Sequence, residues 1–292
     1  MITLSDYITD NISESILSST RTGKVHMDEA LKKYNLDPNE AVLNADGTID
    51  YYGNVMLQAK RLTKLPFRFR KVNGWFLCNN NELTTLDGCP VSVKGVFNCG
   101  ANKLMSLKGG PEQVDGWFYC DHNILTTLEY APEIIKGDFN CSYNNLTSLK
   151  HCPRVIKGSF YCYNNSLTSL KDGPEQMNGE YDCAYNKLTS LEGAPDSVND
   201  DFDCSYNNLT NLDGCPSTVN RHFNCDNNQL TSLIGGPTQV SDSYSCSNNR
   251  LTSLEGLPKK LKKMLFCYGN PGDFTKDDVL ALCKINKINI RL

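Results

Sequence analysis

The sequence of 292 residues lacks the features by which several common protein classes are recognised. No apolar run reaches the roughly 20 residues that a membrane-spanning helix needs, and no apolar N-terminal segment has the form of a signal peptide. The C-x-x-C spacing of tetrahedral zinc sites is absent, and so is the phosphate-binding loop G-x-x-x-x-G-K-[ST]. We therefore expect no membrane insertion, no zinc centre and no P-loop nucleotide site.

Histidine is also scarce, with four residues in the chain. In the repeat described below, His122 and His222 would lie five strands apart, roughly 20 Å or more, which is too far to share a proton transfer. Asp182 and Asp203 would lie on neighbouring strands at roughly 5 Å, the separation of a retaining glycosidase pair. A repeat places like residues side by side in any case, and no protected general acid is indicated. We expect no enzymatic activity and no cofactor or metal.

What the sequence does contain is a repeat of 21 residues. The stretch "NCSYNNLTSL" at 140–149 returns as "DCSYNNLTNL" at 203–212. With Cys141 counted as position 4, position 2 is aromatic, positions 9 and 12 are leucine, position 16 is proline and position 19 is Val, Ile, Met or Leu in nine full copies over residues 75–263. Position 7 is asparagine and position 4 is cysteine in ten successive copies. A fixed period of this length indicates a stacked array.

The string F-x-C-x-x-N-x-L-x-x-L resembles the core of the leucine-rich repeat, L-x-x-L-x-L-x-x-N/C-x-L. It is most similar to the short-repeat leucine-rich proteins of bacteria and tailed bacteriophages. The resemblance covers residues 54–272. It implies a right-handed curved solenoid with a parallel sheet on the concave face, and it implies protein binding.

The residues themselves favour the same fold. Positions 2 and 4 alternate with positions 1, 3 and 5, which is typical of a strand with one buried face. The asparagine at position 7 can donate and accept hydrogen bonds, so it can pair backbone groups of its own turn and of a neighbouring rung. The proline at position 16 suits an extended return path. We predict a β-rich solenoid whose convex face consists of extended segments and turns.

The two ends lack the repeat and divide the chain into three parts. Residues 1–53 are predicted to be a helical cap or attachment region, with helices at 5–18 and 27–35 joined by a linker. Residues 54–272 form the solenoid, and residues 273–292 form a C-terminal cap. In that cap Thr275 is expected to begin a helix with Asp278, and residues 285–292 are expected to supply a covering strand. Docking or dimerisation through the first 53 residues is the alternative.

The chain has fourteen cysteines. Stacked position-4 residues would have Cβ atoms about 4.8 Å apart, beyond the roughly 3.5–4.5 Å of a disulfide. We expect them to be free and to fill the core, and we expect a cytoplasmic protein, in the host cytoplasm if a phage encodes it. Position 15 cycles through Cys, Gly and Ala every three repeats, which indicates growth by duplication of a 63-residue unit.

Function is expected at the outward positions 1, 3, 5 and 6. Both tryptophans and many tyrosines occur there, followed by acids, and no Lys or Arg occupies these positions between residues 75 and 263. The residues expected to bind a partner are Trp75, Leu77, Trp117, Tyr119, His122, Tyr143, Tyr161, Tyr163, Glu180, Asp182, Tyr185, Asp201, Asp203 and Tyr206. Exposed aromatic residues are enriched in interface hot spots, and an acidic field attracts basic partners. Ordinary solvated residues are the alternative interpretation.

These observations predict a non-enzymatic protein-binding module whose partner has a basic or apolar patch. The phage resemblance points to inhibition of a host defence protein, and the alternative is a structural component of a virion or assembly. Basic clusters at 60–71 and 259–263 lie mostly off the strand face, and the net charge is −4. Because an acidic face repels phosphates, nucleic acid is not the expected partner.

Overall fold

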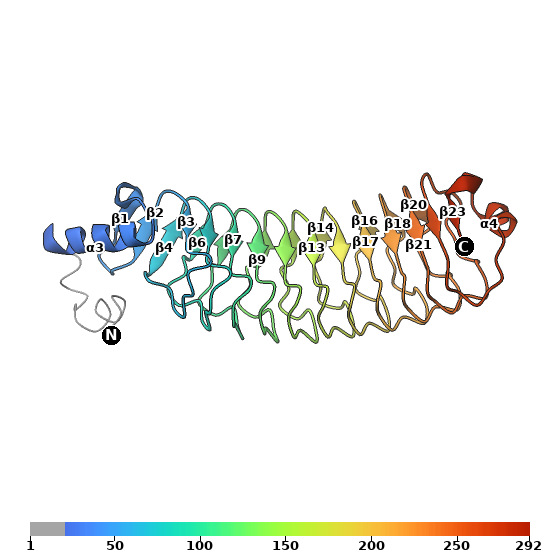
Figure 1. The fold of residues 1–292 in the computed structure, drawn as a ribbon, viewed down its shortest axis with the longest axis horizontal. Helices are drawn as coiled ribbons and strands as arrows, with labels where there is room; N and C mark the ends of the chain where they lie inside the picture. The colour runs from blue at the N-terminus through green and yellow to red at the C-terminus, as the bar shows by residue number, and fades with distance from the viewer. Residues whose placement is uncertain (1–20) are drawn as a thin grey trace.

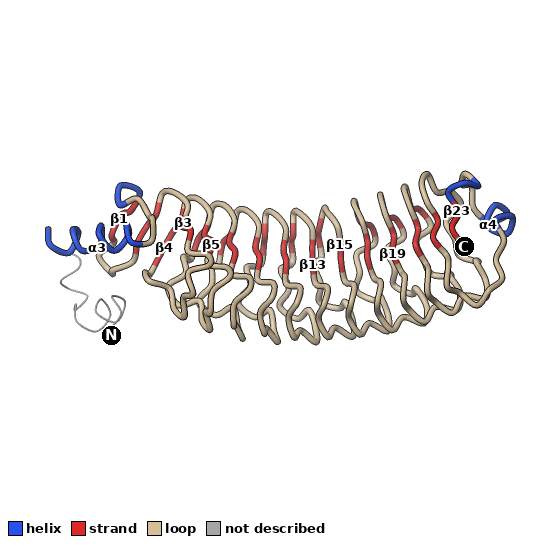
Figure 2. The backbone as a smooth tube through the Cα atoms, in the orientation of Figure 1, coloured by secondary structure: helices blue, strands red, loops and turns tan. Residues whose placement is uncertain are grey.

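The structure, a computed structural model, describes residues 21–292, so the helix expected at 5–18 lies outside the described residues. The chain forms an elongated, gently curved solenoid, with its strands in the upper half of the view and its loops along the lower edge (Figure 1). Most of each rung is loop or turn, and each strand is short (Figure 2). The predicted fold, a β-rich leucine-rich-repeat solenoid with a parallel sheet, is confirmed.

The concave side carries a sheet of twelve strands. Nine of these strands occupy positions 2 and 3 of successive repeats and pair in parallel without slippage, as in the register Phe139↔Phe160. In order along the chain the strands are β3 (Val55–Met56), β5 (Phe76–Leu77), β7 (Phe97–Asn98), β9 (Phe118–Tyr119), β11 (Phe139–Asn140), β13 (Phe160–Tyr161), β15 (Tyr181–Asp182), β17 (Phe202–Asp203), β19 (Phe223–Asn224), β21 (Tyr244–Ser245), β22 (Leu265–Phe266) and β23 (Ile290–Arg291).

A second row of strands was not predicted. It occupies positions 18 and 19 of the return segment, which we define as positions 13–20 of each repeat. The first part comprises β1 (Ala41–Leu43), β2 (Ile49–Tyr51), β4 (Phe69–Val72), β6 (Ser92–Val93), β8 (Gln113–Val114), β10 (Ile134–Ile135), β12 (Val155–Ile156) and β14 (Gln176–Met177). The second part comprises β16 (Ser197–Val198), β18 (Thr218–Val219) and β20 (Gln239–Val240).

The interruption between β14 and β16 coincides with a change at position 21. That position is glycine up to Gly179 and becomes Asp200 in the next repeat. A Cβ atom at Gly179 would lie 2.7 Å from the backbone nitrogen of Ser159, so the close approach of these rungs requires glycine. The β16–β18–β20 ladder continues with Asp200, Arg221 and Asp242 at position 21, so glycine explains the close approach of the earlier rungs and not the break itself.

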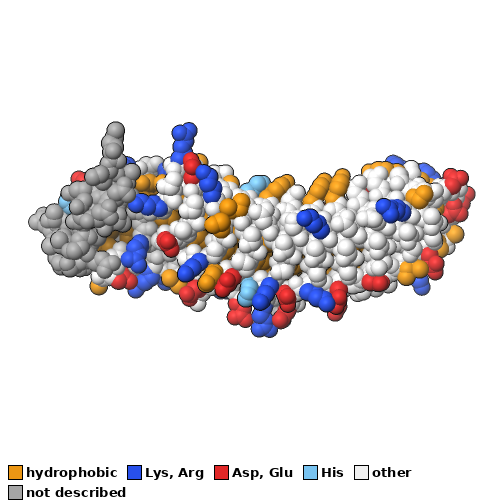
Figure 3. Space-filling view, turned by 90° about the horizontal axis from the view of Figure 1, so that it is seen from below, with side chains coloured by type: hydrophobic (Ala, Val, Ile, Leu, Met, Phe, Trp, Pro, Cys, Tyr) orange, Lys and Arg blue, Asp and Glu red, His pale blue; other side chains and the backbone are white. Residues whose placement is uncertain are grey.

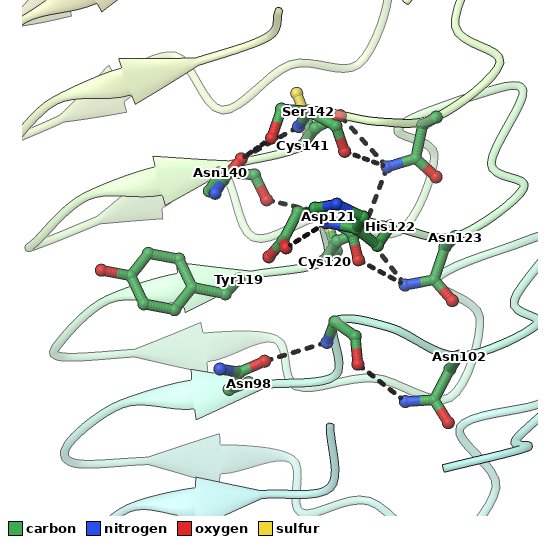
Figure 4. Close-up of polar contacts among 12 residues, drawn as sticks. Asn98, Asn102, Tyr119, Cys120, Asp121, His122, Asn123, Asn140, Cys141 and Ser142 are labelled. Carbon is green, nitrogen blue, oxygen red and sulfur yellow. Dashed lines mark hydrogen bonds and ion pairs between the residues drawn. The ribbon is translucent and has the colours of Figure 1, made fainter. Parts of the chain in front are cut away.

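The asparagine at position 7 joins each rung to its neighbours, as the sequence predicted. The Nδ2 of Asn144 donates to the carbonyl oxygens of Cys141 and Ser142 in its own turn and of Cys120 in the preceding rung, each at 3.1 Å. Its Oδ1 accepts from the backbone nitrogen of Leu125 at 2.9 Å. Asn102 and Asn123 repeat the pattern (Figure 4). One side chain therefore bonds four backbone groups. The carbonyl of Ser142 also accepts from the backbone nitrogen of His122 at 3.1 Å, whereas the other three groups have no backbone partner among the described residues.

Side chains at positions 2 and 4 form two of the columns that fill the core, beside the leucines of positions 9 and 12 and the aliphatic residues of position 19. The position-2 rings stack from rung to rung with centroid separations of 4.8–6.0 Å between Phe76 and Tyr244. All fourteen cysteines are free, as predicted. The thiol of Cys183 also donates to the carbonyl oxygen of Asp203 at 3.2 Å, and burial raises the pKa of this thiol far above its usual range. These thiols are neutral core groups with weak donor bonds along the sheet.

Both ends of the solenoid are covered within the described residues. Helix α3 (Arg21–Lys33) packs Met27, Ala30 and Leu31 against the first rungs, followed by the short helix η1 (Pro38–Glu40) and the β1–β2 hairpin. The predicted linker over 19–26 is wrong for residues 21–26, which are helical. One glycine costs a helix only about 1 kcal/mol, so Gly23 does not end it.

At the other end the predicted helix start at Thr275 is confirmed. Helix α4 (Lys276–Leu282) begins with a capping box between Thr275 and Asp278, and η2 (Lys287–Asn289) leads into β23, which pairs with β22. Of the apolar residues expected to cover the edge, Ile290 is buried and Ile288 is exposed.

Two of the three glycines at position 15, Gly173 and Gly236, pack against a tyrosine, whereas Gly110 is followed by Phe118. Tyr181 is fully buried, and a Cβ atom added to Gly173 would lie 3.3 Å from its hydroxyl oxygen. Gly236 and Tyr244 repeat this arrangement 63 residues later, with a distance of 3.2 Å. Glycine at position 15 of one repeat therefore leaves space for the hydroxyl of a tyrosine at position 2 of the next repeat. The hydroxyl of Tyr181 has no hydrogen-bond partner among the described residues.

We expect Asn144→Ala to lower the free energy of unfolding by about 3 kcal/mol, because one backbone amide loses its partner and two buried carbonyls lose a hydrogen bond each. Urea denaturation followed by circular dichroism measures this change. Asn145→Ala is the matched control, since Asn145 is the same residue type one position later and is exposed. Equal effects of the two substitutions would contradict the role given to position 7.

We expect Tyr181→Phe to raise the free energy of unfolding by about 1 kcal/mol, because it removes a buried hydroxyl without a partner. The reciprocal change Phe160→Tyr should destabilise by about 1–3 kcal/mol, because Cys152 fills the place that Gly173 leaves open. Urea midpoints of the two variants test the pair. A neutral Phe160→Tyr would show that position 15 does not control the choice of ring.

Candidate binding surface

The structure places all fourteen predicted residues along the concave strand face and its rim. Five aromatic side chains are exposed by 43–47%, and His122 is exposed as well. These five are Trp75, Trp117, Tyr143, Tyr185 and Tyr206. The other eight residues are half-buried. Five rungs at about 4.8 Å separate the rung of Trp75 from that of Tyr185, so the set is an extended strip and not one pocket.

The two tryptophans are held flat against the next rung. A Cβ atom added to Gly137 would overlap the Cδ1 atom of Trp117, and Gly95 is related to Trp75 in the same way. The ring of Trp117 also contacts Tyr119, with centroids 5.9 Å apart. Half of each indole remains exposed in a fixed orientation. A large rigid side chain of this kind loses little conformational entropy when a partner covers it.

The rim of the face has an unusual backbone. Position 6 adopts the left-handed conformation in every full repeat, with φ between 49° and 55°. Asparagine, which tolerates this conformation, occupies four of these positions, but bulky aromatic residues occupy four others. We call these four residues the aromatic rim: His122, Tyr143, Tyr185 and Tyr206. Placing a tyrosine here costs on the order of 1 kcal/mol, whereas histidine, like asparagine, is enriched in this conformation.

The rings of the aromatic rim stack on one another. The ring centroids of His122 and Tyr143 lie 4.1 Å apart and the ring planes are nearly parallel. The ring centroids of Tyr185 and Tyr206 also lie 4.1 Å apart, with an angle of 9° between the ring planes. Tyr163 joins Tyr143 edge-on at 5.3 Å. The Nδ1 of His122 lies 2.8 Å from the carboxylate of Asp121 (Figure 4). The structure thus assembles two separate stacks along the rim.

The acids at position 3 have a second role that the sequence reasoning missed. The Oδ1 of Asp182 accepts from the backbone nitrogen of Ala184 at 2.9 Å, and Asp203 does the same for Ser205 at 2.8 Å. Asn98 and Asn140 form this turn in earlier rungs (Figure 4). Asn or Asp two residues before a turn was the available signal. Only the charge distinguishes the two acids from these asparagines.

Two acids of the strip, Glu180 and Asp182, have raised pKa values. Asp182 and Asp203 are register partners in the parallel sheet. Burial, with a smaller contribution from the charges of Asp203 and Glu180, raises the pKa of Asp182 to about 7. Burial also raises the pKa of Glu180, whose Oε2 accepts from the hydroxyl of Tyr161 at 3.1 Å. Asp201 accepts from the backbone nitrogen of His222 at 2.9 Å.

Basic side chains lie elsewhere on the solenoid. Ion pairs join equivalent positions of neighbouring rungs. Lys94 pairs with Asp115 at position 20, and Arg221 pairs with Asp200 at position 21. The face seen from below carries Lys, Arg, Asp and Glu intermixed along its length (Figure 3). The concave strip therefore differs from the rest of the surface by having acids without interspersed cations at its own positions.

The described residues hold neither a metal-binding cluster nor a membrane-spanning helix. Within residues 21–292 no group of three or more His, Cys, Asp or Glu side chains is arranged to hold a metal ion. None of the helices in this range combines the length and apolar character that a membrane crossing requires.

Comparison with known proteins adds likenesses of fold alone. No protein-family model matches the chain, and no curated protein matches it. A solved structure of YopM from Yersinia enterocolitica WA-314 is 18% identical over 82% of this chain, with a TM-score of 0.49. The chain covers 64% of that protein, less than two thirds of its length. YopM from Yersinia pestis, described as a leucine-rich effector protein, is 16% identical over 74% of this chain and 77% of its own, with a TM-score of 0.38.

We expect the double substitution Tyr185→Asn/Tyr206→Asn to raise the free energy of unfolding by about 1 kcal/mol. Two left-handed tyrosines are relieved at about 1 kcal/mol each, and one stack of about 1 kcal/mol is lost. Thermal and urea denaturation measure the change. Tyr130→Asn is the control, because Tyr130 is exposed and left-handed (φ 72°) on the return segment. A marked loss of stability in the double variant would show that the rim is not strained.

We expect Asp182 to make the protein less stable as the pH rises. Its folded pKa of about 7 lies above its ordinary value of 3.8, so its contribution is present below pH 4 and is lost as the pH passes 7. Asp182→Asn should reduce the fall in unfolding free energy between pH 5 and pH 8 by about 2 kcal/mol. Asp115→Asn should leave that fall unchanged, because Lys136 and Lys94 hold the pKa of Asp115 below its usual range.

Proposed function

We propose that this chain is a non-enzymatic protein-binding module whose concave strip grips one macromolecular partner. The aromatic rim carries the proposal. Four bulky rings occupy a backbone conformation that asparagine occupies in other repeats, and the three tyrosines among them cost stability that the fold itself does not require. Stability given up at a surface is characteristic of a site that is maintained for binding.

The chemistry of the strip defines the partner. Half-exposed indoles and stacked tyrosines offer apolar anchors, and the acids from Glu180 to Asp203 offer negative charge. A partner with an apolar patch beside a basic patch would cover both and would lower the pKa of Asp182 by supplying a cation. Binding such a partner near pH 7 would release a proton.

The partner's identity is a further step of the proposal. The repeat resembles the short leucine-rich repeats of bacteria and tailed phages, and we propose a protein of the bacterial cytoplasm as the target, blocked by this chain. A defence protein of a phage host fits this description. The described residues at both ends cover the ends of the solenoid, and the long concave strip stays exposed between them.

Affinity capture from bacterial lysate with mass spectrometry tests the proposal. We expect one protein to be retained by the wild type and weakened at least tenfold by Trp117→Ala and by Tyr185→Asn/Tyr206→Asn. Asp182→Asn/Asp203→Asn should keep the backbone turns, lower the association rate and reduce its dependence on salt. Tyr130→Asn should bind as the wild type does. A partner retained equally by all these variants would place the site elsewhere.

A further inference from the structure

A slot separates the return segments of two neighbouring repeats. These are the eighth repeat (residues 222–242) and the ninth repeat (residues 243–263). Strand β20 (Gln239–Val240) is the last strand of its sheet. The equivalent residue of the next repeat, Lys260, forms its parallel bridge with Lys284 instead. The two segments enclose a cavity of about 770 Å³, lined on one side by residues of 234–241 and on the other by residues of 255–262.

The C-terminal segment explains why the slot exists. The backbone nitrogen of Lys284 donates to the oxygen of Lys259 at 2.8 Å, and Leu261 donates to the oxygen of Lys284 at 3.1 Å. These bonds continue the ladder toward the C-terminus. Hydrogen bonds from Leu233 to Glu255 and from Lys263 to Asp242 close the slot at its two ends. The ninth return segment is therefore held by the C-terminal segment and by hydrogen bonds at both of its ends. Between these ends it is separated from β20.

The slot exposes an unpaired strand edge. The backbone nitrogens of Gln239 and Ser241 donate to Ser217 and Val219 of the preceding rung, at 3.2 and 3.1 Å. Because backbone groups alternate in direction along a strand, the N–H and C=O of Val240 point the other way, into the slot. In the preceding rung the carbonyl of Val219 is paired by Ser241, so β20 differs from its neighbour in lacking such a partner among the described residues.

The walls of the slot combine an apolar floor with a basic border. Val240, Leu257 and Pro258 are buried, while Ile234 is exposed by 54%. The charged residues of the lining are three exposed lysines and one glutamate: Lys259, Lys260, Lys262 and Glu255. This lining suits a ligand with apolar and acidic groups in alternation, and the free edge suits a ligand with its own backbone donors and acceptors.

We propose that the slot binds an extended acidic peptide segment of a partner protein, which adds as a strand to the edge of β20. The backbone of the peptide pairs with Val240, one face of its side chains packs on the apolar floor, and its carboxylates meet the three lysines. Strand addition of this kind takes its affinity from main-chain bonds and its specificity from alternate side chains. The site is independent of the concave strip, which carries the opposite charge.

A fluorescein-labelled peptide of sequence Glu-Val-Glu-Val-Glu-Val with blocked ends tests the proposal on the full chain. We expect saturable binding by fluorescence anisotropy, weakened at least tenfold by Lys259→Glu/Lys260→Glu/Lys262→Glu. Ile234→Glu should weaken it as well and keeps the three lysines. The same peptide with Lys in place of Glu, and the same peptide with alternate backbone nitrogens methylated, should each bind at least tenfold more weakly. Trp117→Ala should bind the peptide as the wild type does.

Amide hydrogen exchange provides a second readout that charge attraction alone would not change. Saturating peptide should slow exchange of the Val240 amide at least tenfold and leave the Val219 amide unchanged. Three results would overturn the proposal: no binding at 1 mM peptide, equal binding of the methylated peptide, or equal competition by inorganic tripolyphosphate or a DNA duplex.

Discussion

The amide of the position-7 asparagine ties each rung to the one before it, and this link sets the position of every other side chain. A turn that leaves the sheet and enters the core would bury several carbonyls and an amide with no partner. Asn144 bonds four backbone groups across two rungs, and its equivalents repeat the arrangement from Asn81 to Asn270. An apolar residue at position 7 would leave buried backbone groups of this turn without a partner.

A constant repeat length places like residues above like residues, with both benefits and costs. Aromatic rings stack in the core, and thiols donate along the sheet. The same rule brings Asp182 beside Asp203, where burial and a neighbouring charge raise the pKa of Asp182. It also lines up Tyr185 and Tyr206 on the rim in a left-handed conformation. The fold tolerates these costs because hydrogen bonds and apolar contacts of ten similar rungs support each one.

The sequence predicted the features that recur in every copy. The period, the role of the asparagine, the free cysteines and the Thr275 cap were all available from residue type and spacing. The return strands were not, because two-residue strands are too short to show an alternating pattern. The left-handed rim had a signal in Asn80, Asn164, Asn227 and Asn248, but aromatic residues at the same position in other copies obscured it. The positions of the candidate strip on the strand face were available from spacing, and its role in binding stays a prediction. Its two stacks and its turn-forming acids depend on side-chain directions that spacing does not give.

The slot beside β20 could not be predicted from the sequence. It depends on which segment pairs with the ninth return segment, and one of the two neighbouring segments comes from the C-terminal region. The ninth return segment can pair with β20 on one side and with the segment around Lys284 on the other. In a regular solenoid each return strand pairs on both sides. Here the last segment pairs with the segment around Lys284, and β20 is left as the end of its sheet. The pairing of Lys260 with Lys284 thus extends the ladder toward the C-terminus. On the other side of the ninth return segment, the edge of β20 is left unpaired.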